Sequence, residues 1–239
     1  RFLTLKNGIP SHDTFARVFQ RLDPQAFESA FRAWVGSVLT NFTHVAIDGK
    51  SVRGSADGQR GPLHMVTAFA TEFGLALGQE AVVGKSNEIT AIPVLLKALE
   101  LKGCLVTIDA MGCQKAIATT LREQGADYLL AVKNNQRTLR ACVEDALADV
   151  PVEGFEHADD KHGRTVLQHA QVVANTGQVD LALWPDCKSI GRIVSLRVDG
   201  KTRQTLETRY YISSAVLDHQ TFLKYVRNHW AIENNLHWN

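Results

Sequence analysis

Apolar residues in the first forty positions recur at the spacing of helices. Ser11 is typical of an N-cap and predicts a short helix through Leu22, and Asp23 with Pro24 predicts the start of a second helix. This second helix would carry an apolar stripe of Phe27, Phe31, Trp34, Val35, Val38 and Leu39. Their spacing indicates a packing face more than a recognition helix.

Short continuous apolar runs then replace the helical pattern and predict buried strands. Residues 45–47 form one such run and lead into Asp48, and residues 105–108 form another and lead into Asp109. Because a buried strand of this kind stops at a polar loop, each aspartate is expected at a strand end, where it can reach a cleft.

Further strands and helices are expected around these two runs. The additional strands are predicted at 63–73, 75–83 and 128–132, and the helices at about 89–99, at 114–124 and up to about 148. Pro93 fits the first of these helices only if it lies in the first turn. The order of strands and helices predicts an α/β fold of the ribonuclease H-like class, a mixed sheet flanked by helices, although periodicity alone leaves a doubly wound fold open.

The last third of the chain is predicted to be rich in strands. Runs at 165–173, 189–198 and 205–213 are separated by glycine-containing turns, and Asp218 can cap a closing helix over about 220–238. We therefore expect four parts. These are an N-terminal helical segment (1–40), the first part of a catalytic core (41–150), a β-rich insertion (151–216) and the last, catalytic helix of the core (217–239).

Composition excludes several classes of protein. A chain of 239 residues with 45% hydrophobic content can bury a full core, so disorder is not expected. Its four cysteines lie far apart and lack the spacing of zinc ligands, which predicts neither a disulfide framework nor structural zinc and favours the cytoplasm. No apolar run is long enough to span a membrane. A start at Arg1, without methionine, suggests a fragment.

The charge distribution carries more information than the net charge of +1. Residues 144–160 contain seven acids and no Lys or Arg, whereas residues 186–211 contain six bases against three acids. Two interpretations stay open, namely two solvated faces of opposite sign, or a basic surface for a phosphate backbone that includes Arg192, Arg197 and Arg203.

The two strand-end aspartates suggest metal chemistry. If their strands are neighbours, Asp48 and Asp109 would repel each other unless a cation lies between them, and Mg²⁺ prefers such hard oxygen ligands. A third carboxylate from the last helix, Glu233, would complete the site. Each acid also has an ordinary interpretation: either aspartate could cap a loop, and Glu233 could face solvent. Glu88 is a rival third ligand, although it could instead stabilise a helix N-terminus.

Five sequence blocks in this chain resemble those of the H-repeat-associated (ISAs-type) insertion-sequence transposases, within the DDE superfamily. The blocks are IDGKSVRG (47–54), KSNEIT (85–90), TIDAMGCQ (107–114), KNNQ (133–136) and HWAIENNLHW (229–238). Their order and their spread over nearly the whole chain make the resemblance far more specific than any single block.

The resemblance implies a DDE transposase with a catalytic triad of Asp48, Asp109 and Glu233. Such an enzyme would use Mg²⁺ or Mn²⁺, two ions in all, to cleave double-stranded DNA at the ends of an insertion sequence and join them to target DNA. The partners implied are element ends and target DNA, and the assembly is expected to be a homodimer or larger. The expected location is the bacterial cytoplasm, on the nucleoid.

Secondary contacts to DNA are expected from lysines within the blocks. Lys50, Lys85 and Lys133 can reach phosphates, or they are ordinary surface lysines. His229 stands where related transposases carry arginine, and it would contact a phosphate more weakly at neutral pH. Two other functions stay open: a ribonuclease H-like nuclease that cuts without joining, and a truncated, inactive relic that binds DNA or nothing.

Overall fold

The computed structural model describes residues 5–38, 42–52, 54–56, 61–82, 88–150, 153–161, 164–199, 203–230 and 232. The chain forms two compact units, Arg1–Asn41 and Phe42–Asn239. The finer division predicted from the sequence stays a prediction. No helix in the described ranges is both long and apolar enough to cross a membrane.

The first unit consists of helices α1 (His12–Phe19) and α2 (Pro24–Val38). Both predicted N-caps are confirmed: the Ser11 side chain accepts a hydrogen bond from the amide of Thr14, and Asp23 Oδ1 accepts from the amides of Gln25 and Ala26. α1 ends at Phe19, before the expected Leu22.

The predicted packing face of α2 is largely exposed. The side chains of Phe27 and Trp34 are 49% and 51% exposed, and Val35 is the buried residue of this helix. The interpretation of this stripe as a packing face rather than a recognition helix stays a prediction.

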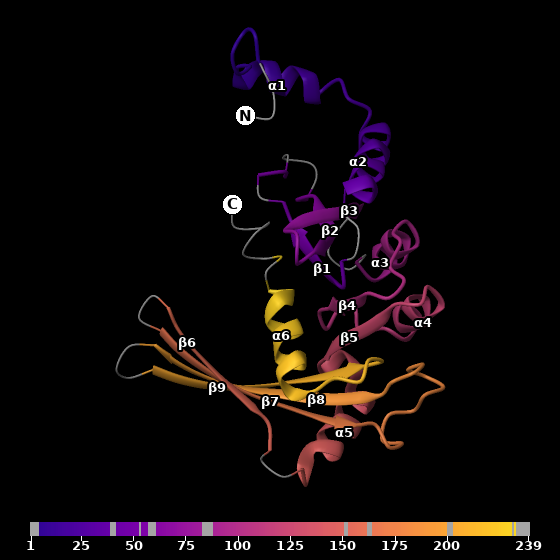
Figure 1. Cartoon of the computed structure of the whole chain (residues 1–239), viewed down its shortest axis with the longest axis vertical. Helices are drawn as coiled ribbons and strands as arrows, with labels where there is room; N and C mark the ends of the chain where they lie inside the picture. The colour runs from indigo at the N-terminus through magenta and orange to yellow at the C-terminus, as the bar shows by residue number, and fades with distance from the viewer. Residues whose placement is uncertain are drawn as a thin grey trace. The chain divides into compact units, whose positions relative to one another are not determined.

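Within the described residues, the second unit is built on one mixed sheet of nine strands. The strands are β1 (His44–Ser51), β2 (His64–Ala70), β3 (Leu75–Val82), β4 (Leu105–Ile108), β5 (Asp127–Val132), β6 (Phe155–Lys161), β7 (Arg164–Ala174), β8 (Ser189–Asp199) and β9 (Arg203–Ser213). Their order is β3-β2-β1-β4-β5-β9-β8-β7-β6 (Figure 1). β1, β4 and β5 run parallel, and the other pairs are antiparallel.

Helices connect the strands in the predicted order. They are α3 (Glu88–Lys97), α4 (Lys115–Glu123), the 3-10 turn η2 (Asn134–Gln136), α5 (Arg137–Ala148) and α6 (His219–His229). The mixed sheet with flanking helices is thus confirmed. Pro93 was placed wrongly, since it lies inside α3 beyond the first turn. The apolar residues that α3 buries, Ala91, Ile92, Leu95 and Leu96, offset the hydrogen bond that proline removes.

Strands β6 to β9 extend the same sheet rather than forming a separate one, and Figure 1 shows them continuing as a long arm. The three predicted runs are confirmed as β7, β8 and β9. β6 was not predicted, because its acidic sequence is unusual for a strand; it forms the edge of the sheet, where charged side chains stay in water.

Helix α6 packs on one face of this sheet and α5 on the other (Figure 1). The Phe222 ring of α6 lies over Gly191 of β8, where a Cβ would approach it to 2.8 Å, and meets the Tyr211 ring edge-on at 5.3 Å. Asp218 caps α6 as predicted, by accepting from the amide of Thr221. Burial of this apolar face fixes the last helix against the sheet.

The pairing of β1 with β4 brings the two aspartates into matching positions. Ile47 lies opposite Ile108 in the parallel register, so Asp48 and Asp109 follow at the same level. β4 ends at Ile108 as expected. The prediction that β1 ends before Asp48 is wrong, because β1 continues to Ser51 through its antiparallel pairing with β2.

Gly49, next to Asp48, is expected to tolerate no side chain. A Cβ at this position would lie 2.5 Å from the carboxyl carbon of Glu88, which is itself buried and hydrogen-bonded by His64. We predict that Gly49→Ala lowers the free energy of unfolding by about 1–3 kcal/mol in urea denaturation. Gly61→Ala is the matched control, because a Cβ there meets no atom within 4 Å. Equal stability of the two variants would contradict this packing argument.

Candidate functional site

A cleft of about 780 Å³ opens at the ends of β1, β4 and β5 and is bounded by β9 and α6. Its charged and aromatic lining residues include Asp48, Asp109, Lys133, Arg140, Glu207, Arg209, Tyr210, His229 and Trp230. These residues come from segments far apart in the sequence. The sheet topology therefore gathers acids, bases and aromatic rings in one place.

Asp48 and Asp109 both line this cleft. Asp48 lies within β1, and Asp109 directly follows β4. Because they follow matched residues on neighbouring parallel strands, their side chains project from the same face of the sheet. The arrangement brings two carboxylates from neighbouring strands into one cleft.

Asp109 also holds the turn that follows it. Its Oδ1 accepts hydrogen bonds from the amides of Met111 at 3.1 Å and Gly112 at 3.3 Å. The loop-capping role that the sequence left open is therefore real. It uses one carboxylate oxygen, so it is compatible with a ligand role for the other.

Two of the residues expected to contact DNA, Lys133 and His229, line the cleft. Lys50 lies two positions beyond Asp48 in β1 and so shares its face of the sheet. Glu233 and Lys85 lie outside the described residues.

Glu88, the rival third acid, lies away from the cleft. It is 4% exposed, begins α3 and accepts a hydrogen bond from His64 Nε2, whose Nδ1 lies 3.1 Å from Ser51 Oγ. Among the residues that the structure describes, no group of three His, Cys, Asp or Glu side chains is arranged to hold a metal. The described part of the cleft thus supplies Asp48 on β1, Asp109 after β4 and a third acid, Glu207, on β9.

Glu207 and Arg209 form a charged wall of the cleft that was not predicted from the sequence. Arg209 donates to both carboxylate oxygens of Glu207, at 2.8 and 2.9 Å, and its guanidinium lies 4.8 Å from the centre of the Trp230 ring. These hydrogen bonds lower the pKa of Glu207, as do the charges of Arg209, Lys133 and Arg197. The i, i+2 spacing of Glu207 and Arg209 is the signal that could have placed them on one face.

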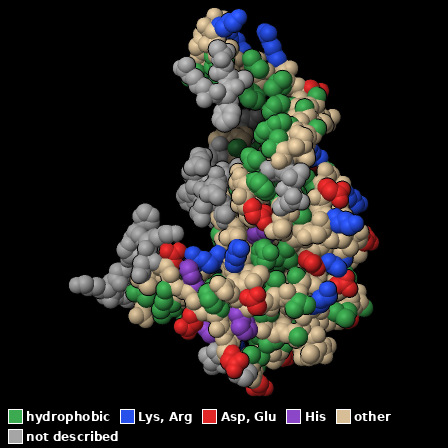
Figure 2. Space-filling view, viewed as in Figure 1, with side chains coloured by type: hydrophobic (Ala, Val, Ile, Leu, Met, Phe, Trp, Pro, Cys, Tyr) green, Lys and Arg blue, Asp and Glu red, His purple; other side chains and the backbone are tan. Residues whose placement is uncertain are grey.

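The basic residues predicted on the insertion do not form one surface. Arg192 and Arg197 are five positions apart on β8, so their side chains project from opposite faces. Arg192 Nε donates to Gln171 Oε1 at 2.5 Å, whereas Arg197 shares the face of Gly191 and α6. The side chain of Arg203 lies outside the described part. On the face in Figure 2, basic and acidic side chains are interspersed.

His229 reaches the cleft from the last turn of α6. Its Nδ1 lies 2.9 Å from Thr107 Oγ1, and the same hydroxyl lies 2.9 Å from His44 Nε2. Burial lowers the pKa of His229 to about 4, although the charge of Asp109 acts in the opposite direction. Burial likewise lowers the pKa of His44 to about 4. Both imidazoles are therefore neutral at neutral pH.

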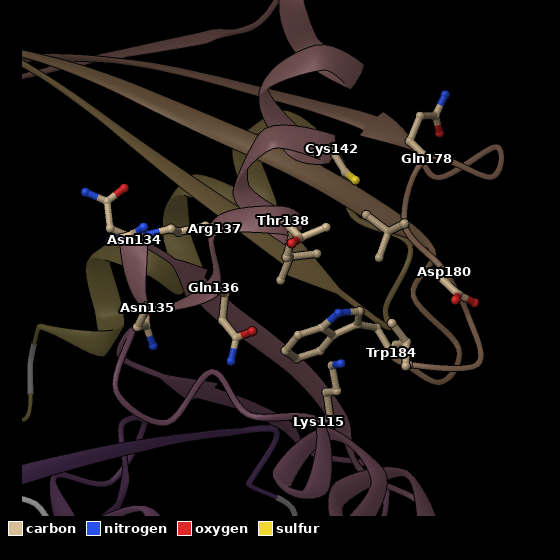
Figure 3. A pocket seen from close by; sticks show the side chains of 13 residues that line it. Lys115, Asn134, Asn135, Gln136, Arg137, Thr138, Cys142, Gln178, Asp180 and Trp184 are labelled. Carbon is tan, nitrogen blue, oxygen red and sulfur yellow. The ribbon is translucent and has the colours of Figure 1, made fainter.

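A second cavity, of about 420 Å³, lies between the starts of α4 and α5 and the segment that joins β7 to β8 (Figure 3). Lys115 and Trp184 point toward one another across it (Figure 3). Its lining residues include a single carboxylate, that of Asp180, so this cavity lacks the pair of acids found in the cleft.

Sequence comparison identifies the family. The family described as "Transposase DDE domain" matches residues 40–238. The chain belongs to this family. A further family, described as associated with the first, matches residues 1–35. The family membership confirms the resemblance that the five sequence blocks predicted.

Two of three relatives of this DDE-domain chain carry transposase names. YncI of Escherichia coli O157:H7, named as a transposase, is 42% identical over 97% of this chain and 63% of its own length. YhhI of E. coli K12, named as an H repeat-associated transposase, is 39% identical over 98% of this chain and 65% of its own length. YbfL of the same strain is 40% identical over the same shares. The chain thus spans slightly less than two thirds of these three relatives.

Proposed function

We propose that this chain is the catalytic domain of a DDE transposase that cleaves phosphodiester bonds at insertion-sequence ends and joins the freed 3′-hydroxyls to target DNA. The observation that carries the proposal is the pair Asp48 and Asp109, at matching levels of neighbouring parallel strands in one cleft. The mixed sheet with its flanking helices supports a ribonuclease H-like core with a β-rich insertion. Membership of the transposase DDE domain family supports the reaction class.

The donor set fits Mg²⁺ or Mn²⁺. Carboxylate oxygens are the ligands that these hard cations prefer, and two acids in one cleft repel each other without a cation. Asp48 and Asp109 would hold the metal, and Glu233 is the proposed third ligand on the pattern of the family. Two bound ions would activate the attacking oxygen and stabilise the leaving one.

Other residues of the cleft would hold the DNA. Lys133, Arg140 and Arg209 line the cleft together with the two aspartates, so a phosphate backbone could pass the acids with its charges neutralised. Arg197 contributes charge near Glu207 at the same wall. We propose double-stranded DNA as the partner, bound by a homodimer or larger assembly on the bacterial nucleoid.

The metal site can be tested without DNA. We predict that millimolar Mn²⁺ raises the melting temperature of the parent chain by about 5 °C or more if it reaches roughly 100 times its Kd. Asp109→Asn should abolish most of this rise, because a charged ligand is removed. Without metal the variant should be as stable as the parent, since asparagine retains an Oδ1 for the amides of Met111 and Gly112 and the repulsion falls.

Asp218→Asn is the control for this metal titration. Asp218 caps α6 and is not among the cleft residues, so its variant should respond to Mn²⁺ as the parent does. Equal shifts in the parent and in Asp109→Asn would eliminate the metal site at Asp109.

The role of the β8 face in DNA binding has a matched pair of variants. Arg197→Gln should flatten the slope of log K against log salt by about 0.9 for each phosphate that the side chain no longer neutralises. Arg192→Gln should leave the slope unchanged, because Arg192 projects from the other face and is bonded to Gln171. Fluorescence anisotropy with a labelled duplex at several salt concentrations measures both. An unchanged slope for Arg197→Gln would make it an ordinary surface residue.

The reaction itself is tested with supercoiled plasmid DNA and a 3′-hydroxyl oligonucleotide in Mn²⁺. The parent should nick the plasmid and join the oligonucleotide to it, and Asp48→Asn and Asp109→Asn should each lose at least about 100-fold in rate. Nicking without joining would reduce the function to that of a nuclease. Absence of both activities in a folded chain that binds metal would refute the proposed function.

A further inference from the structure

A chain of four hydrogen-bonding side chains connects His229 to the interior of the sheet. Thr71 Oγ1 lies 2.8 Å from His44 Nδ1, His44 Nε2 lies 2.9 Å from Thr107 Oγ1, and Thr107 Oγ1 lies 2.9 Å from His229 Nδ1. His44 and Thr107 are only 1% and 3% exposed. Because bulk water does not reach the middle of this relay, its members must satisfy one another.

The protons of the relay can be assigned by counting donors. The Thr107 hydroxyl has one proton to donate and contacts an imidazole nitrogen on each side, and the carbonyl of Val45 is farther away at 3.5 Å. In one arrangement Thr71 donates to His44, His44 donates through Nε2 to Thr107, and Thr107 donates to His229 Nδ1. In every other arrangement of neutral imidazoles that keeps all three hydrogen bonds, His229 donates through Nδ1.

These arrangements differ in what His229 presents to the cleft. If Nδ1 accepts from Thr107, the ring proton of the neutral imidazole is on Nε2. If Nδ1 donates, Nε2 carries a lone pair instead. Nδ1 is turned to Thr107, so Nε2 is the nitrogen left to a cleft that also contains the carboxylates of Asp48 and Asp109, and negative surroundings favour a proton on Nε2 over a lone pair.

We infer that the relay Thr71–His44–Thr107 holds His229 as a neutral imidazole whose Nε2–H donates a hydrogen bond to a phosphate oxygen of the DNA strand bound beside Asp109. This inference rests on the proposed function for the identity of the acceptor. In it, His229 contacts the substrate, whereas Thr107 and His44 are positioning residues.

The relay explains how a histidine can serve at a cleft that already contains carboxylates. A cationic side chain next to Asp109 would be attracted to that acid as well as to a phosphate, so the two anions would compete for it. A neutral donor provides a directed hydrogen bond without this competition. Its direction is fixed by the buried Thr107 and His44 and by the T-shaped contact of His44 with Tyr225, at 4.9 Å between the ring centres.

The first test measures the ring proton directly, with no DNA present. Long-range ¹H–¹⁵N correlation spectra of the imidazoles distinguish Nδ1–H from Nε2–H, and we expect the Nε2–H form at both His229 and His44 in the parent chain. Finding His229 protonated at Nδ1 would overturn the inference. This measurement does not depend on DNA cleavage, so it can succeed even if the proposed function fails.

The second test uses Thr107→Val, which keeps the shape of threonine but removes the hydroxyl, with Thr107→Ser as the rescue variant. Thr107→Val should lower kcat for plasmid nicking in Mn²⁺ by about 10- to 100-fold. KM for DNA should stay within about twofold, because the phosphate contacts of the cleft wall persist. In its spectra the preference for Nε2–H should weaken. Thr107→Ser should behave as the parent in both.

Equal kcat values for the valine and serine variants would overturn the positioning role of Thr107. If Thr107→Val does not fold, as judged by its melting curve, His44→Phe replaces it, because phenylalanine keeps a ring but has no nitrogen to donate to Thr107. This variant should show the same loss of kcat and the same weakening of the Nε2–H preference, and parent-like values would overturn the relay.

Discussion

The parallel pairing of β1 with β4 is the constraint on which the site depends. It sets Ile47 opposite Ile108 and so brings Asp48 and Asp109 to one level at the same face of the sheet. Both strands are buried at this point, so a shift of one residue would turn either aspartate toward the other face and expose apolar side chains. The burial that stabilises the core thus also fixes the relative positions of the two acids. Two carboxylates that share one cleft repel each other, and this repulsion is the basis of the proposed metal site.

The rest of the fold builds the walls around this pair. β9 joins the sheet at β5 and carries Glu207 and Arg209 to the cleft, while α6 packs on the same face and brings His229 to it. Arg209 is neutralised in part by Glu207, so the wall is polar and ordered without being strongly basic. This mixed wall agrees with a net charge of +1 and with the interspersed charges of Figure 2. Affinity for a phosphate backbone would then come from a few placed side chains rather than from a broad basic surface.

The local sequence pattern predicted the individual strands and helices better than it predicted which strands pair with one another. The hairpin around Gly74, the two strands that lead to aspartates and the Asp218 cap all follow from short-range rules, and the structure has them. β6 was missed because its acidic residues suit only an edge strand, and edges are decided by pairing along the sheet. The Glu207–Arg209 wall was missed for a related reason. No local signal says that β9 pairs with β5, or which face of β9 borders the cleft. The opposite projection of Arg192 and Arg197, in contrast, follows from strand alternation alone and could have been stated from the sequence.

Charge also explains why neutrality is useful at His229. The charge of Asp109 acts on this side chain, and a permanent cation there would be attracted to the carboxylate as well as to a phosphate. Burial keeps both His44 and His229 uncharged. The Thr107 hydroxyl between them forms hydrogen bonds with one ring nitrogen of each, which burial would otherwise leave without a partner. The same burial that removes the charge therefore requires the hydrogen bonds that orient the ring. A side chain that is neutral because it is buried, and ordered because its buried atoms are bonded, can provide a directed hydrogen bond without adding a positive charge to the cleft.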